Sequence, residues 1–254
     1  AKLASKELEL TLTGRACGQE ERAPMCGVPF HAADFYIDKL VSLGEKVAIC
    51  EQLSSPTGKD LVKRDVIKVV TAGTITNSDY IDDRLNNFIV SVFIDKGCSA
   101  IAWADITTGE FFTKDFDKNI EELFNNLLKI NPSEIICSNQ AYDLLINSPY
   151  VERKVLPRPE LFIESEYSLY SAEKVIKSQL NTANLLYVGL TCKRCVSCSG
   201  ALISYLKLTQ KIALDNIKNI IKAIKTINPG LKKVYRFYDK ANGYAIADLI
   251  ALYD

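Results

Sequence analysis

Three cysteines in the last third of the chain have the spacing of metal ligands. Cys192, Cys195 and Cys198 are each three residues apart, and thiolates at short intervals are common ligands of Zn²⁺. Residues at positions i, i+3 and i+6 also share roughly one face of a helix. The sequence shows no evident fourth ligand, which structural zinc almost always has. The pattern therefore favours thiols packed along a helix, and we expect no bound metal.

The other reactive side chains give little support for catalysis. His31 is the only histidine, so a Ser/His/Asp or Cys/His mechanism would have to use it. Spacing indicates no nucleophile for it, and we expect His31 to cap the helix that follows. Asp95, Asp105 and Glu110 are candidate magnesium ligands, because paired carboxylates bind that ion. Residues 107–110 indicate a hairpin turn instead, so we predict no catalytic residue.

Charge and composition indicate a globular protein in which any anionic partner is bound locally. Lys plus Arg and Asp plus Glu number 31 each among 254 residues, so no global positive field indicates nucleic acid. The densest basic cluster of the first domain is Lys63 and Arg64 with Lys59 and Lys68, which suits either phosphate contact or a solvated face. No apolar run approaches the roughly 20 residues that span a bilayer. We expect a cytoplasmic protein with reduced thiols.

The elements that would position these residues form a mixed α/β pattern. A helix is predicted over residues 33–43, ending before Gly44, and strands are predicted at 47–50 and 66–70. A second unit begins with three strands, and α/β alternation follows: strands 88–94, 100–103, 111–113 and 134–137, helices 120–128 and 140–146. Beyond residue 159 the pattern predicts helices 171–180, 199–211 and 216–227, and then a hairpin of residues 234–238 and 244–252.

Several sequence blocks, in order, resemble the MutS family of DNA mismatch-recognition proteins. Four lie in its mismatch-recognition domain: residues 10–15 (LTLTGR), 22–33 (RAPMCGVPFHAA), 47–52 (VAICEQ) and 62–74 (VKRDVIKVVTAGT). Residues 105–110 (DITTGE) and 132–136 (PSEII) resemble the family's connector domain, and residues 199–206 and 209–211 resemble the entry into its helical core. Together the blocks cover roughly residues 1–221.

The resemblance implies a small α+β recognition domain at residues 1–74, a linker at 75–87 and a ribonuclease-H-like α/β connector at 88–182. It also places the start of the helical core at residues 183–227. Residues 228–254 do not follow the family. Within them, residues 228–240 (NPGLKKVYRFYDK) resemble a piece of nicotinate phosphoribosyltransferase, too little to imply that activity.

The resemblance also implies which residues face DNA. Arg15 matches a family position on the DNA backbone, where a planar guanidinium pairs phosphate oxygens. Residues 24–29 form a loop bounded by prolines that could press on a minor groove. In that loop Pro24 fixes the chain, Met25 offers a soft apolar contact and Gly27 allows close backbone approach. A merely packed turn is the alternative. Lys63 and Arg64 complete the predicted DNA contacts.

Two family features are expected to lie outside this chain. The Phe-x-Glu motif, whose aromatic ring wedges into the duplex at a mismatch, is expected upstream of Ala1. The phosphate-binding pattern G-x-x-x-x-G-K-[ST] does not occur, so ATP, magnesium, a MutL-type partner and dimerisation are expected of a longer parent protein. We therefore predict a mismatched-DNA-binding fragment. The alternatives are a remnant that binds nothing and a magnesium-dependent nuclease in the second unit.

Overall fold

The computed structural model describes residues 1–18, 21–53, 62–75, 86–211 and 214–222. We call residues 1–75 the first region and residues 86–222 the second region. The predicted hairpin of residues 234–252, the nicotinate-phosphoribosyltransferase-like run, most of the predicted linker and Lys59 lie outside the described residues.

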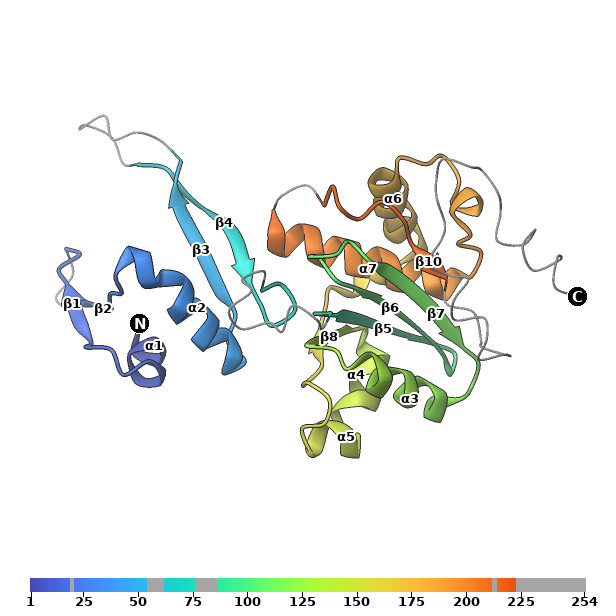
Figure 1. The fold of residues 1–254 in the computed structure, drawn as a ribbon, viewed down its shortest axis with the longest axis horizontal. Helices are drawn as coiled ribbons and strands as arrows, with labels where there is room; N and C mark the ends of the chain where they lie inside the picture. The colour runs from blue at the N-terminus through green and yellow to red at the C-terminus, as the bar shows by residue number, and fades with distance from the viewer. Residues whose placement is uncertain (19–20, 54–61, 76–85, 212–213, 223–254) are drawn as a thin grey trace, which may run out of the picture. The chain divides into compact units, whose positions relative to one another are not determined.

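The first region is built from short helices and two separate two-stranded sheets (Figure 1). Its elements are α1 (Lys2–Glu7), β1 (Thr13–Arg15), β2 (Ala23–Met25), the 3-10 helix η1 (Phe30–Ala32), α2 (Ala33–Ser42), β3 (Val47–Gln52) and β4 (Arg64–Val70). Helix α2 ends where predicted, since Gly44 adopts φ +91° and its N–H bonds to the Val41 carbonyl at 2.9 Å. A left-handed residue just past a helix end is a position that favours glycine.

The second region contains a six-stranded mixed sheet with the order β10-β7-β6-β5-β8-β9. Strands β5, β6 and β7 form the predicted antiparallel meander, while β8 runs parallel to β5 and β9 parallel to β8. This confirms the mixed α/β class and is the arrangement expected of a ribonuclease-H-like connector. The strands are β5 (Ile89–Asp95), β6 (Cys98–Ala104), β7 (Phe111–Phe116), β8 (Glu134–Cys137), β9 (Glu160–Leu161) and β10 (Ile221–Lys222).

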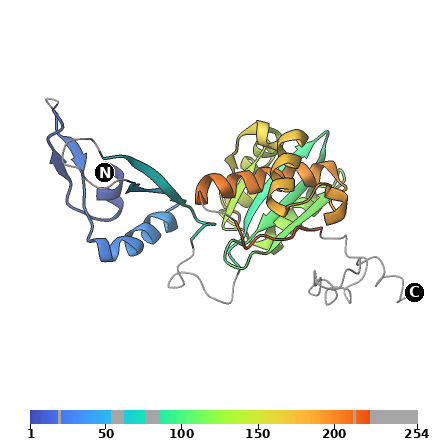
Figure 2. The same cartoon turned by 90° about the horizontal axis from the view of Figure 1, so that it is seen from above.

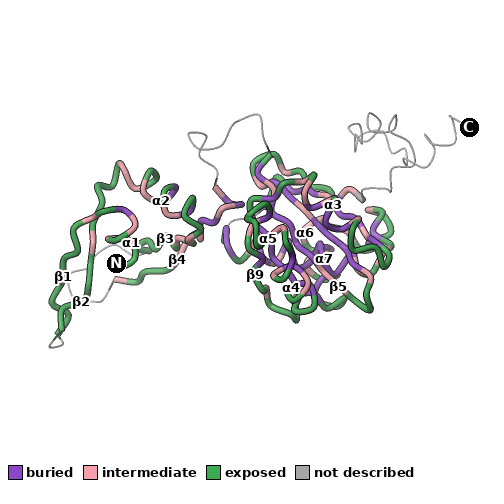
Figure 3. Tube along the Cα trace, turned by 90° about the horizontal axis from the view of Figure 1, so that it is seen from below, coloured by how far each residue is buried: buried purple, intermediate pink, exposed green. Residues whose placement is uncertain are grey.

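Helices cover both faces of this sheet (Figure 2). One core packs α3 and α4 on Val90, Val92 and Ile101, and the other packs α6 and α7 on Ala100 and Ala102. Buried residues are concentrated in this region (Figure 3). The helical elements are α3 (Ile120–Ile130), α4 (Asn139–Ile146), α5 (Pro149–Glu152), η2 (Glu164–Tyr167), α6 (Leu169–Leu180), η3 (Leu185–Val188) and α7 (Lys193–Gln210).

Two sequence-based expectations for the end of the second region are corrected. The predicted boundary at residue 183 does not separate α7 from the sheet, because Cys195, Cys198 and Leu202 of α7 share a core with strands β5 and β6. The helix predicted for residues 216–227 is wrong over its described part. Residues 217–220 are not helical, and β10 pairs in parallel with β7. The Gln179 side-chain amide donates to the carbonyls of Leu214 and Ile217 at 2.8 and 3.1 Å.

Candidate nucleic-acid interface and the junction behind it

The predicted DNA-facing residues at the start of the chain lie together on the ribbon of β1 and β2. The two strands are antiparallel, with Thr13 opposite Met25 and Arg15 opposite Ala23, and the Thr13 hydroxyl donates to the Met25 carbonyl at 2.9 Å. Side chains alternate across a strand, and directly opposed residues share a face. Arg15, two residues from Thr13, therefore projects on the same face as Met25. Both are exposed.

The proline-bounded segment is partly regular, which corrects the expectation that all of residues 24–29 form a loop. Pro24 and Met25 belong to β2, with Pro24 opposite Gly14. A two-stranded ribbon consists only of edges, where proline is tolerated. The segment after the ribbon is apolar and exposed: Val28 is 37% and Phe30 is 95% exposed. Gly27 is exposed in open space. The Arg15 face of the ribbon thus carries a guanidinium and the exposed side chain of Met25, and the segment that follows the ribbon adds exposed apolar residues.

The second predicted basic group lies on a different sheet. Arg64 begins β4 opposite Gln52 of β3, and the Lys63 carbonyl accepts the N–H of Leu53. Both Lys63 and Arg64 are exposed. The structure therefore assigns Arg15 to one two-stranded sheet and Arg64 to the other.

Of three residues considered for chemistry, Asp105 and Glu110 hold a turn, and His31 is exposed. His31 does not cap α2: the cap position is Ala32, which makes no side-chain cap bond, and His31 is exposed in η1. Asp105 is 1% exposed and accepts from the Asn87 N–H at 2.9 Å and from the Thr107 hydroxyl at 2.6 Å. Its oxygens thus hold the turn between β6 and β7. Glu110 accepts from the Asn86 amide at 2.7 Å. This confirms the hairpin turn predicted at residues 107–110.

The three spaced cysteines do not point to one place. Cys198 is buried, and its thiol donates to the Ser91 carbonyl at 2.9 Å, so it is a packed thiol as expected. Cys195 is also buried, but its sulfur lies 3.8 Å from the Asp115 carboxylate, with Cys192 beside them.

The letters Phe-x-Glu do occur once in the chain, at Phe162, Ile163 and Glu164. They lie in the second region, where the Phe162 ring packs edge-on against Tyr205 and Glu164 accepts the N–H of Asn139 at 2.9 Å. These side chains hold β9 and the start of α4 in the connector-like fold. This tripeptide therefore has a structural role in the second region.

Glu134 is the centre of a buried hydrogen-bond cluster that joins residues of the first and second regions. It begins β8 and is 6% exposed. From the first region, the Thr71 hydroxyl donates to its Oε2 at 2.6 Å and the Gly73 N–H at 3.3 Å. From α7, the Tyr205 hydroxyl donates to its Oε1. A buried carboxylate requires such donors, because an unpaired one costs several kcal/mol or loses its charge.

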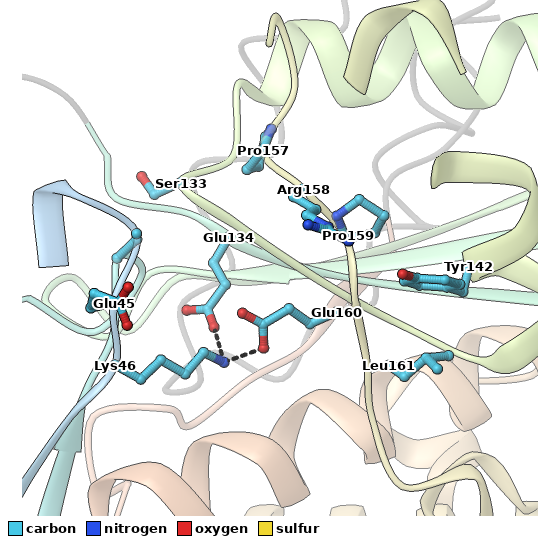
Figure 4. A pocket seen from close by; sticks show the side chains of 12 residues that line it. Glu45, Lys46, Ser133, Glu134, Tyr142, Pro157, Arg158, Pro159, Glu160 and Leu161 are labelled. Carbon is cyan, nitrogen blue, oxygen red and sulfur yellow. Dashed lines mark hydrogen bonds and ion pairs between the residues drawn. The ribbon is translucent and has the colours of Figure 1, made fainter. Parts of the chain in front are cut away.

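Lys46 adds a positive charge to this cluster (Figure 4). Its Nζ lies 3.0 Å from Glu134 Oε1, forms an ion pair with Glu160 and lies 2.9 Å from the Tyr205 hydroxyl. Burial acts to lower the pKa of Lys46, but the Glu134 charge and the bonds to Glu160 and Tyr205 outweigh it, so the pKa is raised. Lys46 is therefore charged at all physiological pH values. We call Lys46, Thr71, Glu134, Glu160 and Tyr205 the junction cluster.

The close packing around Gly73 leaves no room for a side chain at this position. A Cβ at Gly73 would overlap the Ile89 side chain, so Ile89, which is fully buried, would have to shift. Residues 71–74 form a turn in which the Thr74 hydroxyl accepts the Thr71 N–H at 2.8 Å. The block 62–74 and the block 132–136 thus meet at Glu134. Sequence reasoning missed this contact, although a glutamate at the start of an apolar strand was an available signal.

Comparisons with known proteins agree with this architecture. Residues 1–79 match the family described as MutS domain I, and residues 87–218 match MutS domain II. The chain belongs to the MutS family of DNA mismatch repair proteins.

Relatives at about 40% identity carry the name DNA mismatch repair protein MutS. The protein from Acetivibrio thermocellus is 42% identical over 228 residues, covering 86% of this chain and 25% of the relative. The protein from Caldanaerobacter subterraneus is 44% identical over 225 residues, covering 87% and 25%. The chain thus spans about a quarter of the length of these relatives. Among the described residues, no helix has the length and apolar character needed to cross a membrane.

Proposed function

We propose that this chain binds double-stranded DNA containing mismatches, as part of a MutS-type protein that acts in the cytoplasm. The observation that carries the proposal is the β1–β2 ribbon, which presents the fixed charge of Arg15 and the apolar Met25 on one exposed face. A guanidinium positions a duplex through its phosphates, while apolar atoms suit a widened minor groove. Pro24, Gly27, Lys63 and Arg64 extend the proposed contact.

The two regions have different roles in this proposal. The first region contacts the duplex, and the junction cluster transmits its position to the connector-like second region. ATP, magnesium, a MutL-type partner and dimer contacts belong to the remainder of a MutS-type protein in this proposal, since the pattern G-x-x-x-x-G-K-[ST] does not occur in these 254 residues.

Residues 1–75 contain no Phe-x-Glu sequence, so the proposed binding rests on phosphate and groove contacts. Such binding is steeply salt-dependent and discriminates little between matched and mismatched duplex. We expect the affinity of the chain for a 30-base-pair duplex to fall at least tenfold between about 50 and 200 mM salt. Fluorescence anisotropy with G·T-mismatched and matched duplexes measures both quantities.

Two variants of Arg15 test whether the β1–β2 ribbon contacts DNA. Arg15→Ala should weaken binding to both duplexes and reduce the salt slope by about one. Arg15→Lys should recover part of the affinity, because it restores the charge but not the planar fork. Arg153→Ala, an exposed arginine after α5 in the second region, is the matched control and should change neither quantity. Unchanged affinity in Arg15→Ala would refute the assignment of the ribbon.

A further inference from the structure

Cys192, Cys195 and Asp115 bring three potential metal ligands together from two elements. Cys192 is the N-cap residue of α7, Cys195 lies in its first turn, and Asp115 lies on β7. The two sulfurs and a carboxylate oxygen all lie within 4.8 Å of one another, and Cys195 Sγ is 3.8 Å from Asp115 Oδ1. Helical spacing alone brings the two cysteines close together, whereas the Asp115 carboxylate comes from the neighbouring sheet.

We propose that Cys192, Cys195 and Asp115 form a binding site for a thiophilic divalent cation such as Zn²⁺. Zinc–sulfur bonds of about 2.3 Å and zinc–oxygen bonds of about 2.0–2.2 Å place tetrahedral ligand atoms roughly 3.5–3.8 Å apart. The Cys195–Asp115 separation already has this value. The remaining separations, which are at most 4.8 Å, need to close by about 1 Å at most.

Charge and exposure suit an open site of this kind. Two thiolates and one carboxylate carry three negative charges, and a divalent cation neutralises two of them. The Arg194 guanidinium, 3.9 Å from Asp115 Oδ2, balances the third. Cys195 is buried, while Cys192 and Asp115 are partly exposed. The cation therefore enters from the solvent side, and its fourth position is left for water or an added ligand.

Cys198, the third cysteine of the series, does not belong to this site. Cys198 continues the three-residue repeat, but its thiol faces the Ser91 carbonyl of β5. A cation bound by the other two would tie the first turn of α7 to β7. Because the same helix carries Tyr205 into the junction cluster, metal binding should stabilise the helix that supports that cluster.

Cobalt titration of the reduced, metal-free full chain tests the site directly. We expect one Co²⁺ per chain, with a tetrahedral visible spectrum and a near-ultraviolet charge-transfer band of two cobalt–thiolate bonds, both abolished by adding Zn²⁺. Cys192→Ser should weaken uptake at least tenfold. The helix should still form, because serine is a favourable N-cap residue for α7. Asp115→Asn should weaken uptake and leave the charge-transfer band in place.

Cys50→Ser removes an exposed thiol on β3 and is the control, which should bind cobalt as the parent chain does. Circular dichroism of each metal-free variant shows whether it is folded. The proposal is overturned if the folded, reduced chain binds no cobalt, or if Cys192→Ser binds it unchanged. It is equally overturned if the reduced chain takes up no metal and the pair instead forms a disulfide with oxidised glutathione, with release of two reduced glutathione molecules.

Discussion

Glu134 accepts hydrogen bonds from both regions of the chain, so its removal should affect the whole cluster at once. In Glu134→Ala, Lys46 would lose a carboxylate at 3.0 Å, and the hydroxyls of Thr71 and Tyr205 would lose their acceptor. Breaking one partner of a buried charge pair costs about 3–5 kcal/mol. Because Lys46 is one-third exposed, we expect the lower end, about 3 kcal/mol, in urea unfolding.

The control for this prediction is Glu152→Ala, which removes an exposed carboxylate of α5 and should change stability by less than about 0.5 kcal/mol. Tyr205→Phe removes only one donor and should cost about 1 kcal/mol. Equal stability of Glu134→Ala and Glu152→Ala would show that the cluster contributes nothing.

Cys192 should react faster than Cys137 with an alkylating reagent. A hydrogen bond from Cys195 lowers the pKa of Cys192 to about 6, whereas burial raises the pKa of Cys137 to about 12. Only the thiolate is nucleophilic. In the metal-free chain, iodoacetamide should therefore label Cys192 at neutral pH at a rate that falls as pH is lowered through about 6. Peptide mass spectrometry measures it, with Cys137 unlabelled as the comparison. A half-maximal rate above pH 8 would contradict the prediction.

At the scale of elements, the crossing of α6 and α7 depends on one glycine. A Cβ at Gly200 of α7 would lie 2.3 Å from Ala172 Cα and 2.4 Å from its Cβ, so the two helices would have to separate. Alanine gains up to about 1 kcal/mol of helix propensity over glycine. We expect the overlap to outweigh this gain, and Gly200→Ala to lower the free energy of unfolding by about 2 kcal/mol. Gly200→Val should cost more.

Leu208→Ala is the control for the helix crossing, because Leu208 lies on the same helix and is 55% exposed. Its unfolding free energy should stay within about 0.5 kcal/mol of the parent. A Gly200→Ala variant more stable than the parent would mean that the helices shift without cost.

The elements that the sequence predicted well carry a strong local pattern. Strands β5, β6 and β7 are largely buried runs that turn residues separate, and helix α3 buries one face through Leu123, Phe124 and Leu127. Helix α7 was predicted to begin six residues late, at Ser199 instead of Lys193. Nearly all of its residues from Cys195 to Leu206 are buried, and a helix buried on most sides lacks an amphipathic period. Leu214, Ile217 and Ile220 are buried at three-residue spacing, which imitates a helix.

At the scale of the whole chain, local patterns could not predict the junction cluster. Lys46, Glu134 and Tyr205 are separated by more than 70 residues at each step, and a single sequence contains no signal that such residues meet. The opposite holds for Arg15 and Met25, which are ten residues apart and which the resemblance assigned to one DNA-facing side. Their contact with DNA stays a prediction, while their placement on one ribbon face follows from the register.

The two regions should also differ in local stability. In the described part of the first region, the buried apolar residues are Leu8, Val41 and Val70, whereas two extensive cores stabilise the second region. Local opening is easier where few apolar groups are buried. We expect amide hydrogens of β3 and β4 to exchange at least tenfold faster than those of β5 and β6.

The junction cluster should restrain this opening. Lys46→Met removes the ammonium group from Glu134 and Glu160 and keeps the length of the side chain, so it should accelerate exchange in β3 and β4 and leave β5 and β6 unchanged. Lys129→Met, at an exposed position of α3, should alter neither pair of strands. Hydrogen exchange followed by mass spectrometry resolves the two regions. Acceleration in β5 and β6 by Lys46→Met would mean that the chain opens as one cooperative unit, with no separate first region for DNA to displace.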